Sequence, residues 1–152
     1  MKRTERSIKN RNGFTMIEVV AVLLIIGIIS AVAVPRIIGT SDSDLSSQVE
    51  VVKTHLRYAQ IRAMNTDTVW GINFTSTTTY YLFQGAGSTT PVPLPGEDNA
   101  TVNLTTKKSK LTITAPLVRV TFDSYGSPGS ATITIATTGG AITVTKNTGF
   151  IP

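Results

Sequence analysis

The feature that most restricts the fold of this chain is an apolar run from Val19 to Val34, interrupted only by Gly27 and Ser30. With the five residues before it, the run makes 21 residues, about 31 Å long as an α-helix at ~1.5 Å per residue. That length is enough to cross the hydrocarbon core of a bilayer. The sequence therefore predicts a transmembrane helix over residues 14–35.

The basic residues of the chain concentrate before this run. The whole chain has 14 Lys and Arg against 9 Asp and Glu, a formal net charge of +5. Residues 1–13 carry five basic side chains and one acidic one, a charge of +4, and residues 14–152 carry only +1. The positive-inside rule places the first residue in the cytoplasm and the bulk of the chain across the membrane. We therefore interpret the basic excess as a targeting signal rather than a nucleic-acid signature.

Two ordinary interpretations of this N-terminal region are weakened by Glu18, which lies at the start of the apolar segment. A secretory signal cleaved after Ala31-Val32-Ala33 would have an apolar region longer than the usual length of roughly 7–15 residues. That apolar region would also contain the Glu18 carboxylate. A plain membrane anchor would bury the same carboxylate, which costs about 2.5–3.5 kcal/mol at the bilayer centre.

A third interpretation uses the stretch Gly13-Phe14-Thr15-Met16-Ile17-Glu18, which follows the short basic leader and precedes the apolar helix. This stretch resembles the class III signal of type IV prepilins and type II secretion pseudopilins. The resemblance implies that a prepilin peptidase and methyltransferase cleaves after Gly13 and methylates the new amino terminus at Phe14. Residues 1–13 would then be a cleaved leader.

The same resemblance implies an assembly role for the helix that remains. Glu18 would pair with the amine of Phe14 in a neighbouring subunit, and the apolar helix would pack among its copies in a fibre. Gly27 and Pro35 match positions where such pilins carry Gly and Pro. Since Pro35 lacks a backbone donor, we expect a kink or a loosened helix there.

A second helical pattern follows over residues 36–66. Its apolar positions are spaced by three or four residues, as on one face of an amphipathic helix: Leu45, Val49, Val52, Leu56, Ala59 and Ala63. We read Ser41-Asp42-Ser43-Asp44 as a helix-capping segment rather than a calcium loop, because EF-hand spacing is missing.

Residues 67–152 have strand chemistry and predict a globular β domain. Seven strands are expected, over residues 69–74, 78–83, 100–105, 111–115, 117–122, 131–136 and 141–145. Gly139-Gly140 predicts a hairpin between the last two strands. A turn is expected at residues 126–129, and a surface loop at residues 85–96.

The predicted fold class is α+β: a long N-terminal spine helix whose amphipathic half packs on an antiparallel sheet, as in the pilin fold. Residues 56–64, 69–74 and 142–151 are similar to the GspH/FimT group of minor pilins and pseudopilins. The chain has no Cys, which departs from major pilins whose C-terminal loop is closed by a disulfide.

Catalytic chemistry is not expected. His55 is the single imidazole and has no accompanying nucleophile or carboxylate constellation, so we expect it on the helix surface or facing a partner. Ser124 beside Asp123 lacks a nucleophile-elbow pattern and is read as part of a turn. We predict no enzyme activity, no cofactor and no metal site.

Nucleic-acid binding is the alternative function. Lys107, Lys108 and Lys110 cluster between two predicted strands, Lys146 lies near the C-terminus, and some FimT-like competence pilins bind DNA through basic residues. Against it, four lysines in a domain of near-zero net charge make a weak counterion-release surface.

The sequence thus predicts a precursor of a fibre subunit of a type IV pilus or type II secretion pseudopilus. Its expected partners are other subunits, the prepilin peptidase, an inner-membrane assembly platform and, before assembly, membrane lipid. The expected location is the bacterial inner membrane, and afterwards a periplasmic pseudopilus or an extracellular pilus.

Overall fold

The computed structural model describes the backbone of residues 14–38 and 40–152, and the side chains of residues 14–31 and 42–152. The predicted leader lies outside these residues. Helix α1 spans Met16–Ile38 and helix α2 spans Thr40–Thr66. The chain divides into two compact units, with the boundary between Gly39 and Thr40.

Helix α2 buries the stripe that the sequence predicts. Val49, Val52, Leu56, Ala59 and Ala63 are all buried, and Leu45 packs partly buried against the same cluster. The helix packs mainly on β1 and also contacts β5 and β7. The prediction of an amphipathic helix packed on β structure is confirmed.

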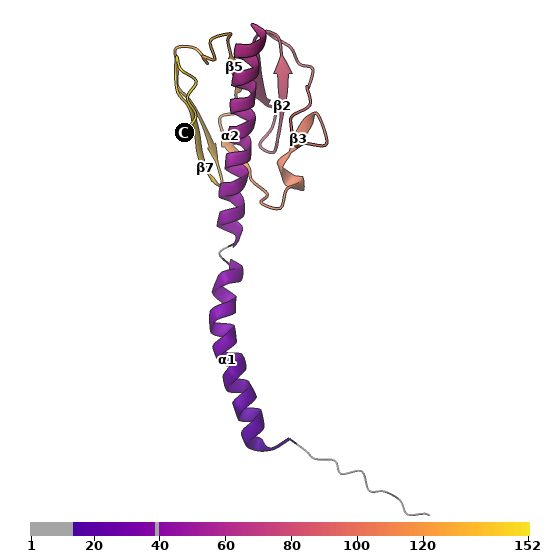
Figure 1. Ribbon diagram of the computed structural model, residues 1–152, viewed down its shortest axis with the longest axis vertical. Helices are drawn as coiled ribbons and strands as arrows, with labels where there is room; N and C mark the ends of the chain where they lie inside the picture. Colours follow the sequence, from indigo (N-terminus) through magenta and orange to yellow (C-terminus); the bar gives the residue numbers. More distant parts are fainter. Residues whose placement is uncertain (1–13, 39) are drawn as a thin grey trace, which may run out of the picture. The chain divides into compact units, whose positions relative to one another are not determined.

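The β residues form two antiparallel sheets, although the sequence had suggested one (Figure 1). A four-stranded sheet has the order β3-β2-β1-β5, and a three-stranded sheet has the order β4-β6-β7. The strand bounds are β1 Trp70–Phe74, β2 Thr79–Gln84, β3 Thr101–Asn103, β4 Ile113–Ala115, β5 Arg119–Phe122, β6 Ile133–Thr137 and β7 Gly140–Val144. A short 3₁₀ helix, η1, covers Leu104–Thr106.

The change of sheet occurs between β4 and β5. β4 pairs with β6, and it ends at Ala115, directly before Pro116. Because proline has no backbone N–H to give to a ladder, it favours the end of a strand. The chain then enters the other sheet through β5, which pairs with β1.

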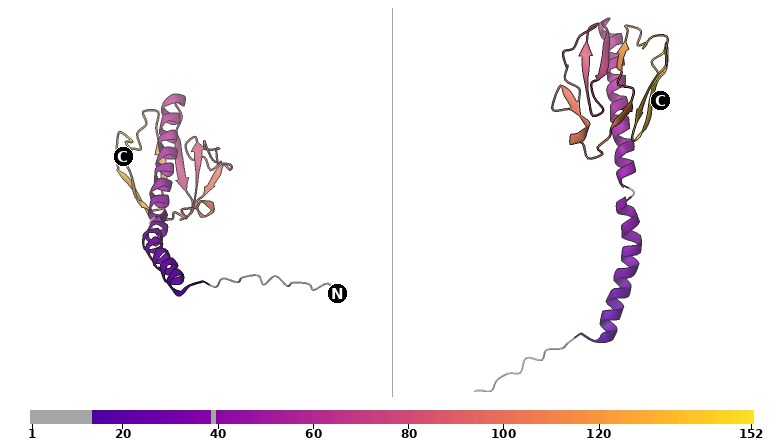
Figure 2. Two further views of the ribbon diagram at one scale, coloured as in Figure 1. Left: turned by 60° about the horizontal axis from the view of Figure 1, so that its bottom comes forward. Right: turned by 180° about the vertical axis from the view of Figure 1, so that it is seen from behind.

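The core of the second unit lies where α2 meets both sheets. The strands of the two sheets lie on either side of α2, and the same arrangement is visible from behind (Figure 2). The largest fully buried side chains include Trp70, Tyr80 and Phe122 from the first sheet and Ile135 and Ile142 from the second. The alternation predicted for the last two strands is present, since Ile135, Ile142 and Val144 point inward.

The turn of the C-terminal hairpin lies so close to α2 that it requires a glycine at position 139. β6 and β7 pair through Thr137 and Gly140, so the predicted hairpin is confirmed. A Cβ at Gly139 would come within 3.0 Å or less of Val49 Cγ2, Leu111 Cδ1 and the Leu45 carbonyl oxygen. A glycine therefore lets this turn lie close against α2.

Candidate assembly site

Helix α1 presents apolar side chains on every side. The exposed fractions of its large apolar residues range from 48% at Val19 to 86% at Met16. The exposed set is Met16, Ile17, Val19, Val20, Val22, Leu23, Leu24, Ile25, Ile26, Ile28 and Ile29, and Phe14 precedes the helix at 82%. A helix that is apolar all round is stable when other apolar groups surround it. The first unit therefore offers a surface that requires partners.

The beginning of α1 is capped by its own sequence. The backbone N–H of Glu18 donates to the carbonyl oxygen of Thr15 at 3.1 Å and faces its hydroxyl oxygen at 3.4 Å. Thr15 thus stands at the N-cap position and Glu18 at N3, which is the residue spacing of a capping box, and the Thr15 hydroxyl forms the N-cap half of that motif. The carboxylate of Glu18 lies in the first turn, where the partial positive charge of the helix favours an anion. This arrangement holds Glu18 beside Phe14, with which it lines a shallow apolar hollow.

Gly13, Gly27 and Pro35 are the other residues that the sequence predicts to act in processing or in loosening the helix. Gly13 lies outside the described residues. A Cβ at Gly27 would meet no heavy atom within 4 Å, and the helix continues through this residue. Pro35 lies inside α1, which continues to Ile38, and its side chain is outside the described part. The loosening expected at Gly27 and Pro35 stays a prediction.

Within the described residues, the structure contains no helix that is both long enough and apolar enough to span a membrane. The 21-residue segment counted from the sequence runs to Val34, beyond residue 31, where the described side chains of α1 end.

The lysines proposed for nucleic-acid contact are partly neutralised. Lys107 Nζ lies 2.7 Å from the carboxylate of Glu97, and Lys108 Nζ lies 3.1 Å from that of Asp44. Lys110 is exposed and has a left-handed backbone, with φ +49°. Two of the three clustered charges are therefore already balanced by acids.

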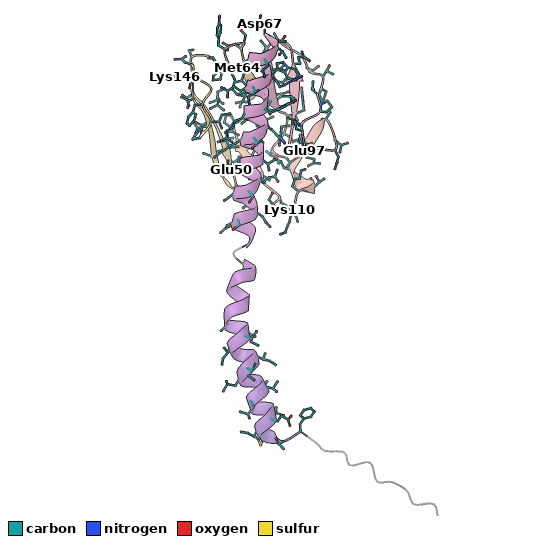
Figure 3. The ribbon with its side chains drawn as sticks, in the orientation of Figure 1. Glu50, Met64, Asp67, Glu97, Lys110 and Lys146 are labelled. Atoms are coloured by element: carbon teal, nitrogen blue, oxygen red, sulfur yellow. The ribbon has the colours of Figure 1, made fainter. Side chains whose placement is uncertain are left out.

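Lys146 does not join this cluster. The backbone N–H of Thr138 bonds the carbonyl oxygen of Thr112, so the segment after Lys110 lies at the turn of the C-terminal hairpin. Lys146 follows the opposite end of β7, and Figure 3 shows Lys146 and Lys110 at separate ends of the unit. The structure thus divides the predicted basic set between two places.

His55 is buried, and the expectation that it lies on the helix surface is wrong. Its side chain is 5% exposed, and its Nδ1 lies 2.9 Å from the hydroxyl of Tyr80 on β2. Burial lowers the pKa of His55, against the opposing effects of the Glu97 carboxylate and the Pro95 carbonyl. Burial also raises the pKa of Tyr80, so both partners are neutral near pH 7.

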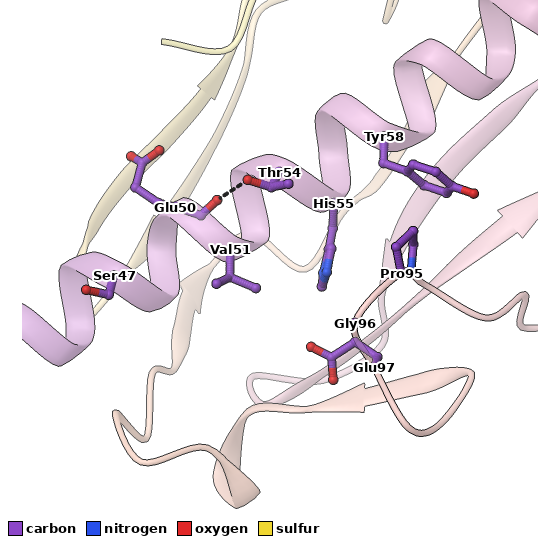
Figure 4. Close-up of a pocket in the computed structure, with 9 residues that line it drawn as sticks. All are labelled: Ser47, Glu50, Val51, Thr54, His55, Tyr58, Pro95, Gly96 and Glu97. Atoms are coloured by element: carbon purple, nitrogen blue, oxygen red, sulfur yellow. Dashed lines mark hydrogen bonds between the residues drawn. The ribbon is translucent and has the colours of Figure 1, made fainter.

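A groove of about 450 Å³ lies beside His55, which forms part of its lining (Figure 4). Residues 47–58 of α2 form one wall, and Pro95, Gly96 and Glu97 form the other. Pro95 and Gly96 of this wall belong to the loop at residues 85–96, which is mostly exposed as expected but buries Leu94. His55 therefore marks the place where this loop folds against α2.

The described residues include no group of three or more His, Cys, Asp or Glu side chains arranged to hold a metal ion. Asp123 accepts hydrogen bonds from the backbone N–H groups of Tyr125 and Ser127 at 3.0 and 2.8 Å. The backbone N–H of Gly126 also donates to the carbonyl oxygen of Asp123, so the turn spans residues 123–126 and contains Ser124, as expected for that serine, whereas the turn expected at residues 126–129 is wrong by three residues.

Two features of the site escaped the sequence reasoning. Thr15 was not recognised as a cap, although Thr15-Met16-Ile17-Glu18 has the Thr-x-x-Glu spacing of a capping box. The burial of His55 was also missed, although it lies three residues after Val52 and four before Ala59, on the buried face.

Comparison with known proteins bears on the first unit. Residues 8–34 match the family model described as a prokaryotic N-terminal methylation motif. The match confirms the class III prepilin signal of the type IV pilin and pseudopilin family, which the sequence had suggested. It supports a pilin-like or pseudopilin structural subunit rather than an enzyme. No curated protein and no solved structure matches the chain.

Proposed function

We propose that this protein is the precursor of a fibre subunit of a type IV pilus or type II secretion pseudopilus. The observation that carries the proposal is the apolar surface of α1, which is exposed on all sides over the described side chains up to residue 31 and lies within the methylation motif matched at residues 8–34. Such a helix needs a bilayer before assembly and copies of itself afterwards. The second unit has a core built from its own residues.

The proposed processing follows from the position of the motif. The prepilin peptidase cleaves after Gly13 and methylates Phe14, which leaves an amine four residues before Glu18. A neighbouring subunit then supplies its amine to this carboxylate. Since an unpaired charge among apolar helices is unfavourable, the pairing selects one register between subunits.

The proposed location has two stages. The precursor lies in the inner membrane with residue 1 in the cytoplasm, and the mature subunit enters a periplasmic pseudopilus or an extracellular pilus through the assembly platform. The α+β unit with α2 on antiparallel sheets agrees with a pilin fold. We place the chain in the GspH/FimT-like group on the sequence similarities of residues 56–64, 69–74 and 142–151.

Mass spectrometry of the mature chain tests this proposal. We expect the chain to begin at Phe14 with one additional methyl group, and Gly13→Leu to block cleavage because a bulky side chain obstructs the peptidase. Gly27→Ala is the matched control, since nothing lies within 4 Å of the added methyl. A mature chain that begins at Val34 contradicts the proposal and identifies an ordinary secretory signal.

The DNA-binding minor pilin remains the alternative function, with less support. Its lysines are ion-paired at Lys107 and Lys108, and Lys146 lies apart from them.

A further inference from the structure

Three Asn-X-Thr sequons lie in the second unit: Asn73-Phe74-Thr75, Asn99-Ala100-Thr101 and Asn103-Leu104-Thr105. This sequence is the acceptor of N-linked glycosylation in proteins exported across a membrane. We propose that Asn99 carries an N-linked glycan and that the other two sequons do not. The inference rests on the proposed function, because the second unit must be exported to meet the transferase.

The sequon at Asn73 is enclosed by the sheet. Asn73 lies on β1, between β2 and β5, and its side-chain amide donates to the hydroxyl of Tyr81 at 2.9 Å. The hydroxyl of Thr75 lies 2.9 Å from that of Thr79. Both groups that a transferase must reach are engaged, so modification here would require the central strands to separate.

The sequon at Asn103 is folded onto itself. Asn103 caps η1, and its side-chain oxygen accepts from the backbone N–H of Thr105 at 2.9 Å and from its hydroxyl at 2.7 Å. The hydroxyl that identifies a sequon therefore already donates to the acceptor residue. Binding in an extended conformation would undo this turn.

The sequon at Asn99 is open. Asn99 is exposed on a bend that precedes β3, and Thr101 is exposed as well. Among the residues that the structure describes, neither the side-chain amide of Asn99 nor the hydroxyl of Thr101 has a hydrogen-bond partner. In the other two sequons, by contrast, Asn73 bonds Tyr81 and Asn103 bonds Thr105. A transferase can reach both groups without breaking a side-chain hydrogen bond.

Both ends of this bend are held, so a glycan there would not loosen the core. On one side Glu97 is tied to Lys107 at 2.7 Å, and on the other Thr101 pairs with Tyr81. β3 is the edge strand of its sheet, which leaves one side of the segment free of neighbouring strands. The exposed bend can therefore carry a bulky, solvated group without displacing a neighbouring strand.

The transfer requires an oligosaccharide linked to a lipid through pyrophosphate. A bond forms between Nδ2 of Asn99 and C1 of the first sugar, and the bond from C1 to the pyrophosphate oxygen breaks. The lipid pyrophosphate leaves with the electron pair, and the amide nitrogen loses one proton. No oxidant or reductant takes part.

The test is peptide mapping of the mature, full-length chain purified from the cells that make it. Trypsin releases residues 63–107, which contain all three sequons, and cleavage after Glu97 separates Asn73 from the other two. Fragmentation then distinguishes Asn99 from Asn103. We expect a saccharide mass on Asn99 alone, and complete loss of that mass in Asn99→Gln and Thr101→Val.

Two variants and one parallel measurement keep the outcomes separate. Thr101→Ser preserves the sequon at Asn99 and should retain the glycan. Asn103→Gln removes the neighbouring sequon and should also leave the glycan on Asn99 in place. Protease digestion of spheroplasts reports export of the second unit independently. An exported chain that starts at Phe14 and is unmodified at Asn99, or modified at Asn73 or Asn103, overturns this inference alone. A chain that is not exported overturns the proposed function as well.

Discussion

Nδ1 of His55 and the hydroxyl oxygen of Tyr80 lie 2.9 Å apart, which joins α2 to β2 inside the core of the second unit. The two rings are tilted, with centroids 5.9 Å apart. The groups that face His55 from other elements are the Pro95 carbonyl, the Glu97 carboxylate and the Lys107 ammonium. This pair couples the stability of the unit to pH.

The fragment from Thr40 to Pro152, which contains the whole core cluster, should lose stability on mild acidification. Burial lowers the pKa of His55 below its ordinary value of 6.5, so the unfolded chain binds this proton first as the pH falls. The free energy of unfolding should therefore be constant above about pH 7.5 and decrease below about pH 6.5. Urea titrations at several pH values measure this.

His55→Gln is the control for that titration, because it keeps a polar side chain and has no proton to bind in this range. Its stability should vary less between pH 7.5 and pH 5.5 than that of the unaltered fragment, with the window set by the ordinary histidine pKa of about 6.5. Equal slopes for the two proteins would assign the pH dependence to other groups.

Two positions on α2 should respond very differently to truncation. Leu56 is fully buried, and Leu56→Ala should lower the free energy of unfolding by about 2–5 kcal/mol through lost contacts and a cavity. Ile61 is 50% exposed, and Ile61→Ala should change it by about 0.5 kcal/mol or less. Comparable losses at both sites, measured by denaturation, would contradict the orientation of α2.

Two glycines with positive φ provide a second matched pair. Gly87 has φ +75° and open space around it, so Gly87→Ala should cost only the backbone strain of about 1–2 kcal/mol. Gly149 has φ +64°, but an added Cβ would overlap the Gly126 carbonyl oxygen and the amide of Gln60. Gly149→Ala should add an overpacking penalty of about 1–3 kcal/mol. Thermal unfolding of both variants distinguishes the two effects, and equal shifts would argue against the close contact.

Glu18→Ala should abolish incorporation into a fibre while the chain remains processed at Phe14. The carboxylate lies in the exposed first turn of α1, and the core cluster of the second unit consists of residues of that unit, so the stability of the second unit should not change. Asp67→Asn, which removes an exposed acid at the end of the second unit's helix, is the control and should assemble normally. Sheared-fibre fractions provide the measurement, and normal assembly of Glu18→Ala would refute the pairing model.

Replacing Lys107, Lys108 and Lys110 by Ala should have little effect on DNA binding, because the first two are balanced by Glu97 and Asp44. A gel shift with the fragment from Thr40, repeated across salt concentrations, should show weak binding at most. Salt-sensitive binding that the triple variant loses would instead favour the DNA-binding alternative.

Periodicity predicted α2 and a strand near each of the seven observed ones, although residues 104 and 105, which were expected in the third strand, belong to the 3₁₀ helix η1. The spacing from Leu45 to Ala63 predicted the buried face of α2, and alternation predicted β6 and β7. Such patterns depend on which side of each element is apolar, and the spacing of apolar residues within the element is enough to determine that side. Strand pairing is not local, and the transfer of the chain from β4 to the other sheet could not be read from either strand alone.

The site was predictable to the extent that it is a short contiguous motif. Residues 13–18 identified the prepilin signal from the sequence, and the family match at residues 8–34 agrees. The environment of His55 depends instead on Pro95 and Tyr80, which are 40 and 25 residues away along the chain. A polar residue on a helix is buried or exposed according to what folds over it, and here the covering loop is rich in proline and was expected to remain outside.

The apolar surface of α1 limits what can drive assembly in the proposed function. Hydrophobic free energy is gained when an apolar side chain leaves water, and a helix that moves from lipid into a bundle of identical helices leaves no water behind. The step from bilayer to fibre is therefore nearly neutral for the side chains of Val, Leu and Ile. Preference for the fibre must then come from close packing at small residues such as Gly27, from the Glu18 pairing, and from work done by the assembly machinery. In the proposed function, the return of a subunit from the fibre to the bilayer would likewise expose none of these side chains to water, so the hydrophobic effect would oppose neither direction.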